Sequence, residues 1–426
     1  MANTILIKNI KGLVGVDDGN ILKRSGAEMS QLSIIENAFL LIEDGLIKDF
    51  GEMNSSQFTV HSSQFTVNRE PSTINCIIDA TGKFVLPSFV DSHTHLVFAA
   101  SREEEFVMRI KGKSYEEIAA AGGGILNSAK KLQTMGEDEL FENALLRLNE
   151  MLGFGTGAVE IKSGYGLTVK DELKMLRVIQ RLKKVSPITI KATFLGAHAI
   201  PPEYKENRNG YINLIIDEML QQIAAEKLAD YCDVFCDKGF FTVYETDKIL
   251  NAAAKFGLKA KIHGNELGQT GGVQVAVKNN AISVDHLEFA GDEEIECLKN
   301  SNTMPTALPN CSFFLGLPYA PVRKMIDAGL PVCLATDFNP GSSPNPRMSF
   351  VVSLACTQMK MTPEEAINAT TINGAYALEL SKAHGSIAKG KVANVFITKQ
   401  ISSLAYIPYS FGVDMVDQKI VGGKIY

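Results

Sequence analysis

From residue 84 to residue 335 the sequence alternates short apolar runs with longer stretches of helical periodicity. Such alternation is typical of parallel strands that are joined by crossover helices. The eight runs lie at residues 84–90, 157–161, 188–195, 231–235, 258–262, 281–284, 303–308 and 331–335. Because eight strand–helix repeats close a barrel, we predict an α/β fold built on a (β/α)8 TIM-like barrel.

The two ends of the chain have a different pattern, rich in β-type segments. Apolar runs at 38–42 and 46–50 flank Asp44-Gly45, a hairpin signal, and further strands are predicted at 394–397 and 417–424. Residues 55–60 return as 62–67, a duplication that we expect to lengthen an exposed loop or hairpin. Since chain ends often meet, we predict a composite β-sandwich domain of residues 1–82 and 386–426 beside a barrel of residues 83–385.

Charge, cysteine usage and the absence of long apolar stretches limit the partners, disulfides and cellular location that we expect. The net charge is −6 without a Lys/Arg run, so we expect no nucleic acid and no membrane as partner, while one arginine could still bind an anionic small molecule. Seven scattered cysteines do not indicate a disulfide framework, and Cys232 and Cys236 are predicted to be core thiols. Without a signal-peptide pattern or an apolar stretch of membrane-spanning length, we expect a cytoplasmic protein.

Polar side chains follow the ends of most of the predicted barrel strands. A parallel barrel gathers its chemistry at the carboxyl ends of the strands, and His93 and His95, two residues apart, point to the same side. Taken singly, the two histidines could be a hydrogen-bonded pair in a turn, and His198 could close a turn before Pro201-Pro202. The residues that share this placement are His93, His95, Tyr165, His198, His263, Glu266, His286 and Asp337. Their joint position favours a single site on one rim.

Imidazoles and a carboxylate on one rim are suitable ligands for a divalent ion such as Zn²⁺. Water bound to such an ion loses its proton near pH ~7 instead of ~16, which gives a hydroxide nucleophile under cellular conditions. The expected chemistry is hydrolysis.

Five segments carry a resemblance to a known family over nearly the whole chain. They are Val90-Asp91-Ser92-His93-Thr94-His95, Glu160-Ile161-Lys162-Ser163-Gly164-Tyr165-Gly166-Leu167, Phe194-Leu195-Gly196-Ala197-His198, Val284-Asp285-His286-Leu287-Glu288 and Ala335-Thr336-Asp337-Phe338-Asn339-Pro340-Gly341-Ser342. The chain resembles the amidohydrolase superfamily, and within it the family that opens the ring amide of 4-imidazolone-5-propanoate to give N-formimidoyl-L-glutamate.

The resemblance implies one Zn²⁺ or iron ion per subunit. The implied ligands are His93, His95, His263 and Asp337. Many members of the superfamily bridge two metals with a carboxylated lysine, so Lys162 keeps a binuclear site open as an alternative. For catalysis, Glu266 is expected to carry a proton from water or substrate to the departing nitrogen, with Asp337 able to share this role, and His286 is expected to donate to the oxyanion.

The propanoate of such a substrate needs a fixed cation. Arg102 is the candidate, although Arg102 followed by Glu103, Glu104 and Glu105 would by charge pattern alone be a solvated helix surface. Tyr115 and Tyr165 are expected to add hydroxyl donors. The remaining expected contacts to the ring or to the product are His198, Asn339, Gly341 and Ser342.

Two alternative functions stay open at this level. One is a sibling hydrolase such as a ring deaminase, and the other is a non-catalytic barrel scaffold. Relatives also suggest a homodimer. Outside the site, His61 and His384 are predicted to lie on the surface, and the segment 122–124 is predicted to be a lid rather than a nucleotide-binding loop. Related hydrolases commonly carry Ala-Asp near the last strands, where this chain has Ala393-Asn394; we expect an effect on folding or none.

Overall fold

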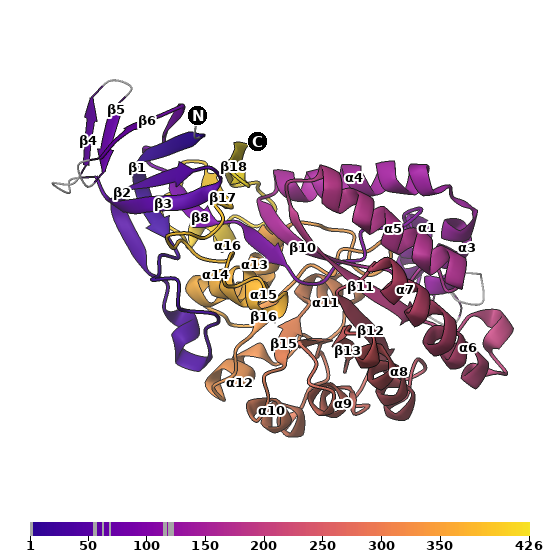
Figure 1. Cartoon of the computed structure of the whole chain (residues 1–426). Coiled ribbons are helices and arrows are strands. Elements are labelled where there is room, and N and C mark those ends of the chain that lie inside the picture. Colours follow the sequence, from indigo (N-terminus) through magenta and orange to yellow (C-terminus); the bar gives the residue numbers. More distant parts are fainter. Residues whose placement is uncertain (1–2, 54–57, 62–63, 68–69, 114–116, 118–122) are drawn as a thin grey trace.

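The computed structural model describes residues 3–53, 58–61, 64–67, 70–113, 117 and 123–426. Within them, eight parallel strands form one sheet in sequence order (Figure 1). They are β9 (Phe89–Asp91), β10 (Thr156–Lys162), β11 (Thr189–Ala197), β12 (Tyr231–Cys236), β13 (Lys259–Gly264), β14 (Ser283–His286), β15 (Met304–Ala307) and β16 (Cys333–Leu334). Each predicted run contains or overlaps one of these strands, so the barrel prediction is confirmed.

The first and last strands of this sheet meet just past their carboxyl ends. Thr94 and Phe338 form a parallel bridge, the Asp337 amide donates to the His93 carbonyl at 3.0 Å, and the His95 amide donates to the Phe338 carbonyl at 2.8 Å. These contacts nearly close the barrel. The segments that close it therefore carry three of the residues predicted to bind the metal.

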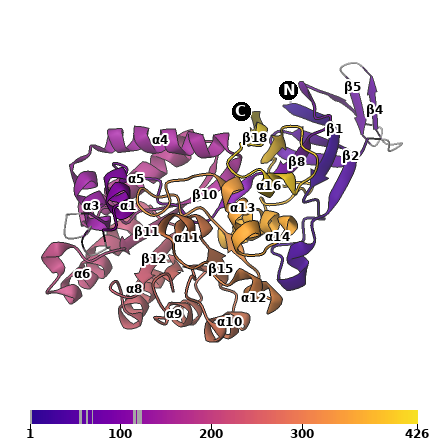
Figure 2. The ribbon, with the colours of Figure 1, turned by 180° about the vertical axis from the view of Figure 1, so that it is seen from behind.

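Helices cover the outside of the sheet, as two opposite views show (Figures 1 and 2). They are α1 (Glu103–Ile110), α3 (Ile125–Thr134), α4 (Glu137–Gly153), α5 (Val169–Val185), α6 (Arg208–Leu214), α7 (Leu220–Glu226), α8 (Val243–Lys255), α9 (Gly272–Lys278), α10 (Asp292–Lys299), α11 (Pro309–Leu315), α12 (Val322–Asp327), α13 (Met348–Gln358), α14 (Pro363–Thr370), α15 (Ile372–Ala377) and α16 (Tyr406–Tyr409). A π-helical turn, Ile215–Met219, joins α6 to α7. Among the described helices, none combines the length and the apolar character that crossing a bilayer requires.

Both ends of the chain enter a second, mixed sheet, which confirms the predicted β-rich unit beside the barrel. Its order is β19-β18-β17-β8-β1-β2-β3, with β7 also paired to β1. The strands are β1 (Thr4–Val14), β2 (Ile34–Glu43), β3 (Leu46–Glu52), β7 (Cys76–Asp79), β8 (Phe84–Pro87), β17 (Val395–Thr398), β18 (Val416–Val421) and β19 (Lys424–Ile425). The predicted hairpin joins β2 to β3, and both turn residues, Asp44 and Gly45, have the positive φ of a two-residue turn.

The run 84–90, predicted as one strand, is divided between the two sheets. Its first part is β8, which pairs with β1 and β17, and its second part is β9 of the barrel. Pro87 has no amide hydrogen, so it cannot donate a hydrogen bond to a neighbouring strand of the mixed sheet. After it, the Ser88 amide donates to the Asn394 carbonyl at 2.9 Å and the Phe89 amide donates to the Gly155 carbonyl at 3.0 Å. The hydrogen bonding thus passes from one sheet to the other at Ser88.

The duplicated segment forms part of a small separate sheet. Strand β4 (Phe58–His61) pairs antiparallel with β5 (Gln64–Val67), and β5 pairs with β6 (Glu70–Thr73). The described parts of the two copies, β4 and β5, therefore pair with each other, while the expectation that the duplication lengthens an exposed loop or hairpin stays a prediction. His61 lies on β4, but its side chain is outside the part of the structure that is described, so its predicted exposure stays a prediction.

The prediction that His384 lies on the surface is wrong. Its side chain is 6% exposed, and its Nδ1 and Nε2 lie 3.4 Å from Asn394 Nδ2 and 3.3 Å from Thr189 Oγ1. Burial, and then the nearby Lys391, lower its pKa to about 4. The same Asn394 amide donates to the Gly157 carbonyl of β10 at 3.0 Å. An aspartate could not donate this bond, which gives a structural reason for Asn at this position.

The state of the cysteines agrees with the prediction from the sequence. All seven cysteines are free thiols, and Cys232 and Cys236 on β12 are buried, as expected of core residues.

Candidate metal centre and substrate cavity

Four side chains predicted to bind a metal converge where the barrel closes. His93 Nε2 and His263 Nε2 each lie 3.3 Å from His95 Nε2. Asp337 Oδ1 lies 3.5 Å from His93 Nε2 and 3.6 Å from His95 Nε2. All four residues are at most 3% exposed. At the barrel mouth, His95 Nε2 therefore lies 3.3–3.6 Å from the donor atoms of the other three residues.

These separations suit a tetrahedral divalent ion. With metal–ligand bonds of about 2.0–2.1 Å, the ligand atoms of a tetrahedral site stand about 3.3–3.4 Å apart. Four of the six separations among these atoms, at 3.3–3.6 Å, are within a few tenths of an ångström of this geometry. The residues present fit a metal ion.

Two buried carboxylates fix which ring nitrogens face the centre. Asp285 Oδ2 lies 2.7 Å from His93 Nδ1, and Asp233 Oδ2 lies 3.0 Å from His263 Nδ1. A carboxylate at Nδ1 holds the ring proton there, which leaves the lone pair of Nε2 for a metal. Both imidazoles are thus held in the tautomer and orientation of metal ligands.

The histidines are held in the neutral form that a metal requires. Burial, followed by the charge of Lys162, lowers the pKa of His93 well below its usual value, and burial lowers the pKa of His263 to about 4 although Asp233 opposes it. Burial, opposed by His286, raises the pKa of Asp337 to about 6. Neutral imidazoles and an ionisable carboxylate are the donor set that zinc and iron accept.

Beneath the centre lies a buried network of charged side chains. The Lys162 ammonium contacts Glu160 at 2.8 Å and Asp233 at 2.7 Å, and Lys261 contacts Glu160 at 2.7 Å. Burial disfavours the charge on Lys162, but Asp233, Glu160 and Asp285 outweigh it and raise the Lys162 pKa above its usual value. Since carboxylation of a lysine requires the neutral amine, this environment argues against Lys162 as the bridge of a binuclear site.

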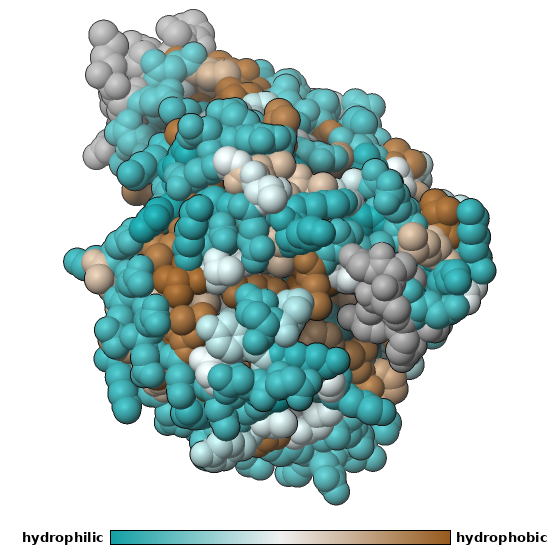
Figure 3. Space-filling model, turned by 90° about the vertical axis from the view of Figure 1, so that its right-hand side faces the viewer, coloured by the Kyte–Doolittle hydropathy of each residue, from teal (hydrophilic) through white to brown (hydrophobic). Residues whose placement is uncertain are grey.

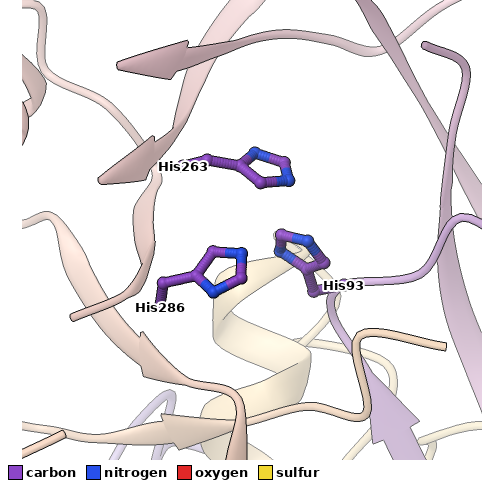
Figure 4. Close-up of side chains that lie close together, drawn as sticks. All are labelled: His93, His263 and His286. Atoms are coloured by element: carbon purple, nitrogen blue, oxygen red, sulfur yellow. The ribbon is translucent and has the colours of Figure 1, made fainter. Parts of the chain in front are cut away.

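Glu266 and His286 form a second polar pair beside the imidazole cluster. Figure 4 shows His286 close to His93 and His263, with the three rings gathered around one space. His286 Nε2 lies 3.6 Å from Glu266 Oε2, and its Nδ1 lies 3.6 Å from Glu288 Oε2. Burial opposes a charge on His286, but Glu266 and Glu288 outweigh it and raise its pKa well above the usual value. Burial also raises the pKa of Glu266, although His286 opposes this.

The cluster opens into a cavity of about 460 Å³. Figure 3 looks onto the right-hand side of the Figure 1 view, where apolar side chains gather around the hollowed centre of that face. The predicted substrate residues that line the cavity are Arg102, Tyr165, His198, Glu266, Asn339, Gly341 and Ser342. Tyr115, and Gly122 of the predicted lid segment, lie outside the described residues.

Arg102 lies in the cavity wall rather than on a solvated helix surface. Its side chain is 11% exposed, and its Nε and Nη2 donate to Glu105 Oε2 at 2.9 and 2.6 Å. A Cβ atom on Gly341 would overlap the Arg102 guanidinium, with Nη1 and Cζ the nearest atoms. Glu105 and the bare backbone of Gly341 therefore fix where this guanidinium lies.

The loop after β16 positions the Oδ2 atom of Asp337. Asn339 Oδ1 accepts the backbone amides of Gly341 and Ser342, each at 2.8 Å, and Asn339 Nδ2 donates to the Asp337 carbonyl and to Ser342 Oγ, each at 2.7 Å. Ser342 Oγ in turn donates to Asp337 Oδ2 at 3.3 Å. The Asn339 amide is thus used within its own loop, and Ser342 orients the carboxylate of the centre.

The opposite wall is aromatic. His198 Nδ1 donates to the Gly164 carbonyl at 3.0 Å, and its ring stacks on His95 with centroids 5.2 Å apart. Tyr165 packs beside both rings. Phe235 and Phe240, which the sequence did not single out, stack on each other in the same wall, with centroids 4.0 Å apart. This wall offers a flat apolar surface to a planar ring.

Sequence reasoning also missed a second arginine of the cavity. Arg109, on α1, lines the same space, and its buried Nη1 has no hydrogen-bond partner among the described residues. Its guanidinium lies over the Phe314 ring, 5.6 Å from the centroid. The spacing of seven residues from Arg102, two helical turns apart, was the signal that both could point to one side.

Comparison with known proteins agrees with this architecture. The model of the amidohydrolase family matches residues 84–426. A guanine deaminase from C. acetobutylicum is structurally similar, with a TM-score of 0.69 at 16% identity over 99% of this chain and 100% of that one. A zinc-bound adenosine deaminase from Xanthomonas campestris gives 0.68 at 15% identity over 99% and 92%. At such identities the likeness shows the fold alone. The barrel, the mixed sheet and the family match define a metal-dependent hydrolase, and the chain belongs to the amidohydrolase family.

Sequence relatives define the branch of that family. The imidazolonepropionase of Flavobacterium johnsoniae is 58% identical over 420 residues, which cover 99% of each chain. That of Christiangramia forsetii is 56% identical over 422 residues, covering 99% of this chain and 100% of that one, and that of Shouchella clausii is 42% identical over 425 residues. The chain belongs to the imidazolonepropionases, enzymes named for a small-molecule substrate.

Proposed function

We propose that this chain hydrolyses the ring amide of 4-imidazolone-5-propanoate to N-formimidoyl-L-glutamate, using one Zn²⁺ or Fe ion held by His93, His95, His263 and Asp337. The observation that carries the proposal is the convergence of these donors around His95 Nε2, which lies 3.3–3.6 Å from the other three, at the mouth of a cavity that also presents two arginines. A bound metal lowers the pKa of water, so that a hydroxide nucleophile is available at neutral pH, and the metal also acts as a Lewis acid toward the ring carbonyl.

Glu266 is the proposed proton carrier. It lines the cavity three residues after His263, and burial raises its pKa toward the working range of a general base. In its ionised form Glu266 takes the proton of the attacking water, and it then returns this proton to the ring nitrogen as the amide bond breaks. The Asp237 carboxylate, which accepts the Glu266 amide at 2.7 Å, holds the loop in position.

His286 is the proposed donor to the oxyanion. Glu266 and Glu288 stand 3.6 Å from its two ring nitrogens and favour its charged form. A buried imidazolium aimed at the site of attack stabilises the negative charge that develops on the carbonyl oxygen.

The substrate carboxylate is proposed to bind the arginines. Arg102 is already neutralised in part by Glu105, whereas Arg109 presents a buried nitrogen with no partner among the described residues. A contact between a carboxylate and a charged group contributes about 1.5–3 kcal/mol. Tyr165 and His198 flank the ring site, and Tyr115 is proposed as a further hydroxyl donor.

A ring deaminase, the sibling hydrolase that the sequence left open, is the second candidate. The two functions differ in the need for a carboxylate anchor. Changing both arginines to Ala should raise KM for imidazolonepropanoate by at least about tenfold, and unchanged kinetics would favour a neutral substrate. A homodimer and a cytoplasmic location remain predictions from the sequence.

The direct test follows the ultraviolet loss of freshly made imidazolonepropanoate with metal-loaded protein. His263→Ala should remove both the metal and turnover, while Glu266→Gln should keep the metal and lose most of the rate. Glu245→Gln, on α8 and outside the cavity lining, is the matched control and should keep both. A normal rate in Glu266→Gln would contradict the role given to Glu266, and no turnover by fully loaded wild-type protein would overturn the proposed function.

A further inference from the structure

A thiol lies against the Glu266–His286 pair. Cys311, near the start of α11, is fully buried, and its Sγ lies 3.9 Å from Glu266 Oε1. Glu266 Oε2 lies 3.6 Å from His286 Nε2. One donor atom from each of these three residues lies within 4.8 Å of the other two. Sulfur, nitrogen and oxygen donors thus meet from three different elements of the barrel.

The separations approach those of a tetrahedral zinc site. With bonds of about 2.3 Å to sulfur and about 2.0–2.2 Å to nitrogen and oxygen, the sulfur–oxygen distance of such a site is about 3.6 Å and the nitrogen–oxygen distance about 3.4 Å. The observed distances of 3.9 Å, from Cys311 Sγ to Glu266 Oε1, and 3.6 Å, from His286 Nε2 to Glu266 Oε2, exceed these by a few tenths of an ångström. Since they involve different oxygens of Glu266, binding requires the carboxylate to turn so that one oxygen meets both donors.

The outer side of His286 also resembles that of a metal ligand. Its Nδ1 faces Glu288 Oε2 at 3.6 Å, and neither atom has a hydrogen-bond partner among the described residues. In the first cluster, Asp285 stands behind His93 and Asp233 behind His263 at the shorter distances of 2.7 and 3.0 Å, so Glu288 has to move closer to act in the same way. A carboxylate behind an imidazole fixes its tautomer for metal binding at the other nitrogen.

The local charge and the access route favour a cation. Glu266, Glu288 and Asp337 surround one imidazole, and each of these acids contributes to the electrostatic environment of Glu266 or His286. Glu266 and His286 line the open cavity, so an ion can reach the pair from solvent. Cys311 is fully buried beside them.

We propose that Cys311, Glu266 and His286 form a second, inhibitory site for a thiophilic divalent cation such as Zn²⁺ or Cd²⁺. The Cys311 thiol releases its proton to solvent as the metal–sulfur bond forms, and a proton on Glu266 or on His286 Nε2 is released in the same way. The site is distinct from the four-ligand centre. The inhibitory effect rests on the proposed function, because the ion occupies the residues that carry the proton and stabilise the oxyanion.

Binding is tested with the full-length protein and Cd²⁺ as the probe. Equilibrium dialysis against excess Cd²⁺ should show one equivalent more in the wild type than in Cys311→Ser, and the ultraviolet absorption of a cadmium–thiolate bond should be lost from the variant. Cys236→Ser is the matched control, because Cys236 is also fully buried but lies outside the three-residue cluster. Equal stoichiometry and equal absorption in the wild type and Cys311→Ser would overturn the site.

Inhibition is tested by adding Zn²⁺ to protein whose first site is already filled, with each rate expressed relative to the same variant without added Zn²⁺. Cys311→Ser should raise the half-inhibitory Zn²⁺ concentration by at least about tenfold, and Cys236→Ser should leave it unchanged. An equal Zn²⁺ response in the wild type and Cys311→Ser would refute inhibition through this site. If no protein hydrolyses imidazolonepropanoate, the proposed function fails, and dialysis still decides whether the cation site exists.

Discussion

The buried network below the imidazole cluster predicts a large effect for Lys162→Met. In the native barrel Lys162 and Lys261 face Glu160, Asp233 and Asp285, two cations against three acids, and all five side chains are completely buried. Met fills much of the same volume but removes one charge, so Asp233 loses its closest cation and Glu160 keeps only Lys261. Breaking a buried ion pair on one side costs about 3–5 kcal/mol, because the remaining charge is left without compensation.

The expected shift in melting temperature follows from the size of the chain. An unfolding entropy of about 2.1 cal/mol/K per residue gives about 0.9 kcal/mol/K for 426 residues. A loss of about 4 kcal/mol therefore lowers the melting temperature by about 4–5 °C in cooperative unfolding. The measurement is calorimetry on chelator-treated protein, so that a change in metal content does not contribute.

Two further variants separate charge from packing. Lys299→Met removes an exposed lysine that pairs with Glu296 at 3.0 Å, and it should cost less than about 1 kcal/mol. Lys162→Met combined with Glu160→Gln removes one cation and one acid, and it should be less destabilised than the sum of its single variants. A melting temperature for Lys162→Met no lower than that of Lys299→Met would refute the reasoning.

Three other changes test neighbouring parts of the structure. Asp285→Asn should weaken the binding of the first metal by about 10- to 100-fold, measured by chelator competition, because it removes the carboxylate behind His93. Gly341→Ala should displace the Arg102 guanidinium and raise KM with the metal content unchanged, whereas Gly136→Ala, whose Cβ would meet open space, should leave KM unaltered. For His384 the folded-state pKa, about 4, lies below the unfolded value of about 6.5. The unfolded chain therefore binds more protons between these values, and the free energy of unfolding falls as the pH drops from 6.5 toward 4. His384→Gln should reduce this pH dependence by up to roughly 3 kcal/mol, measured by urea titration at each pH. Equal pH dependence in the wild type and the variant would contradict the reasoning.

The barrel and the central cluster could be predicted because they follow from local patterns. A buried run that ends in a polar residue defines both a strand and a position on the rim, and this rule located His93, His263 and Asp337 on different strands. The structure brings these three residues together as expected. The rule gave eight candidate residues, and the choice of His93, His95, His263 and Asp337 among them as metal ligands came from the family resemblance.

The surroundings of the cluster depend on pairings that the sequence does not encode locally. Asp233 and Lys162 lie inside or at the end of apolar strands, and only the registers of β10 and β12 with β11, which lies between them, make these two residues partners. His384 was assigned wrongly because its burial comes from Asn394 and Thr189, which belong to distant elements. Arg109 and Cys311 lie on helices that pack over the rim, so the strand-end rule did not find them.

Backbone strain at the rim links the stability of the barrel to the chemistry of the site. His286, Leu287 and Asp337 have φ values of 88°, 71° and 55°, in the region that favours glycine. Each such residue costs about 1–3 kcal/mol and persists only where its surroundings fix it. The Leu287 amide donates to the Gly264 carbonyl at 3.1 Å, and the Asp337 amide donates to the His93 carbonyl at 3.0 Å, so the neighbouring strands supply that constraint. Because one of these bonds also closes the barrel, the contact that completes the fold is the contact that holds the Asp337 carboxylate against the imidazoles.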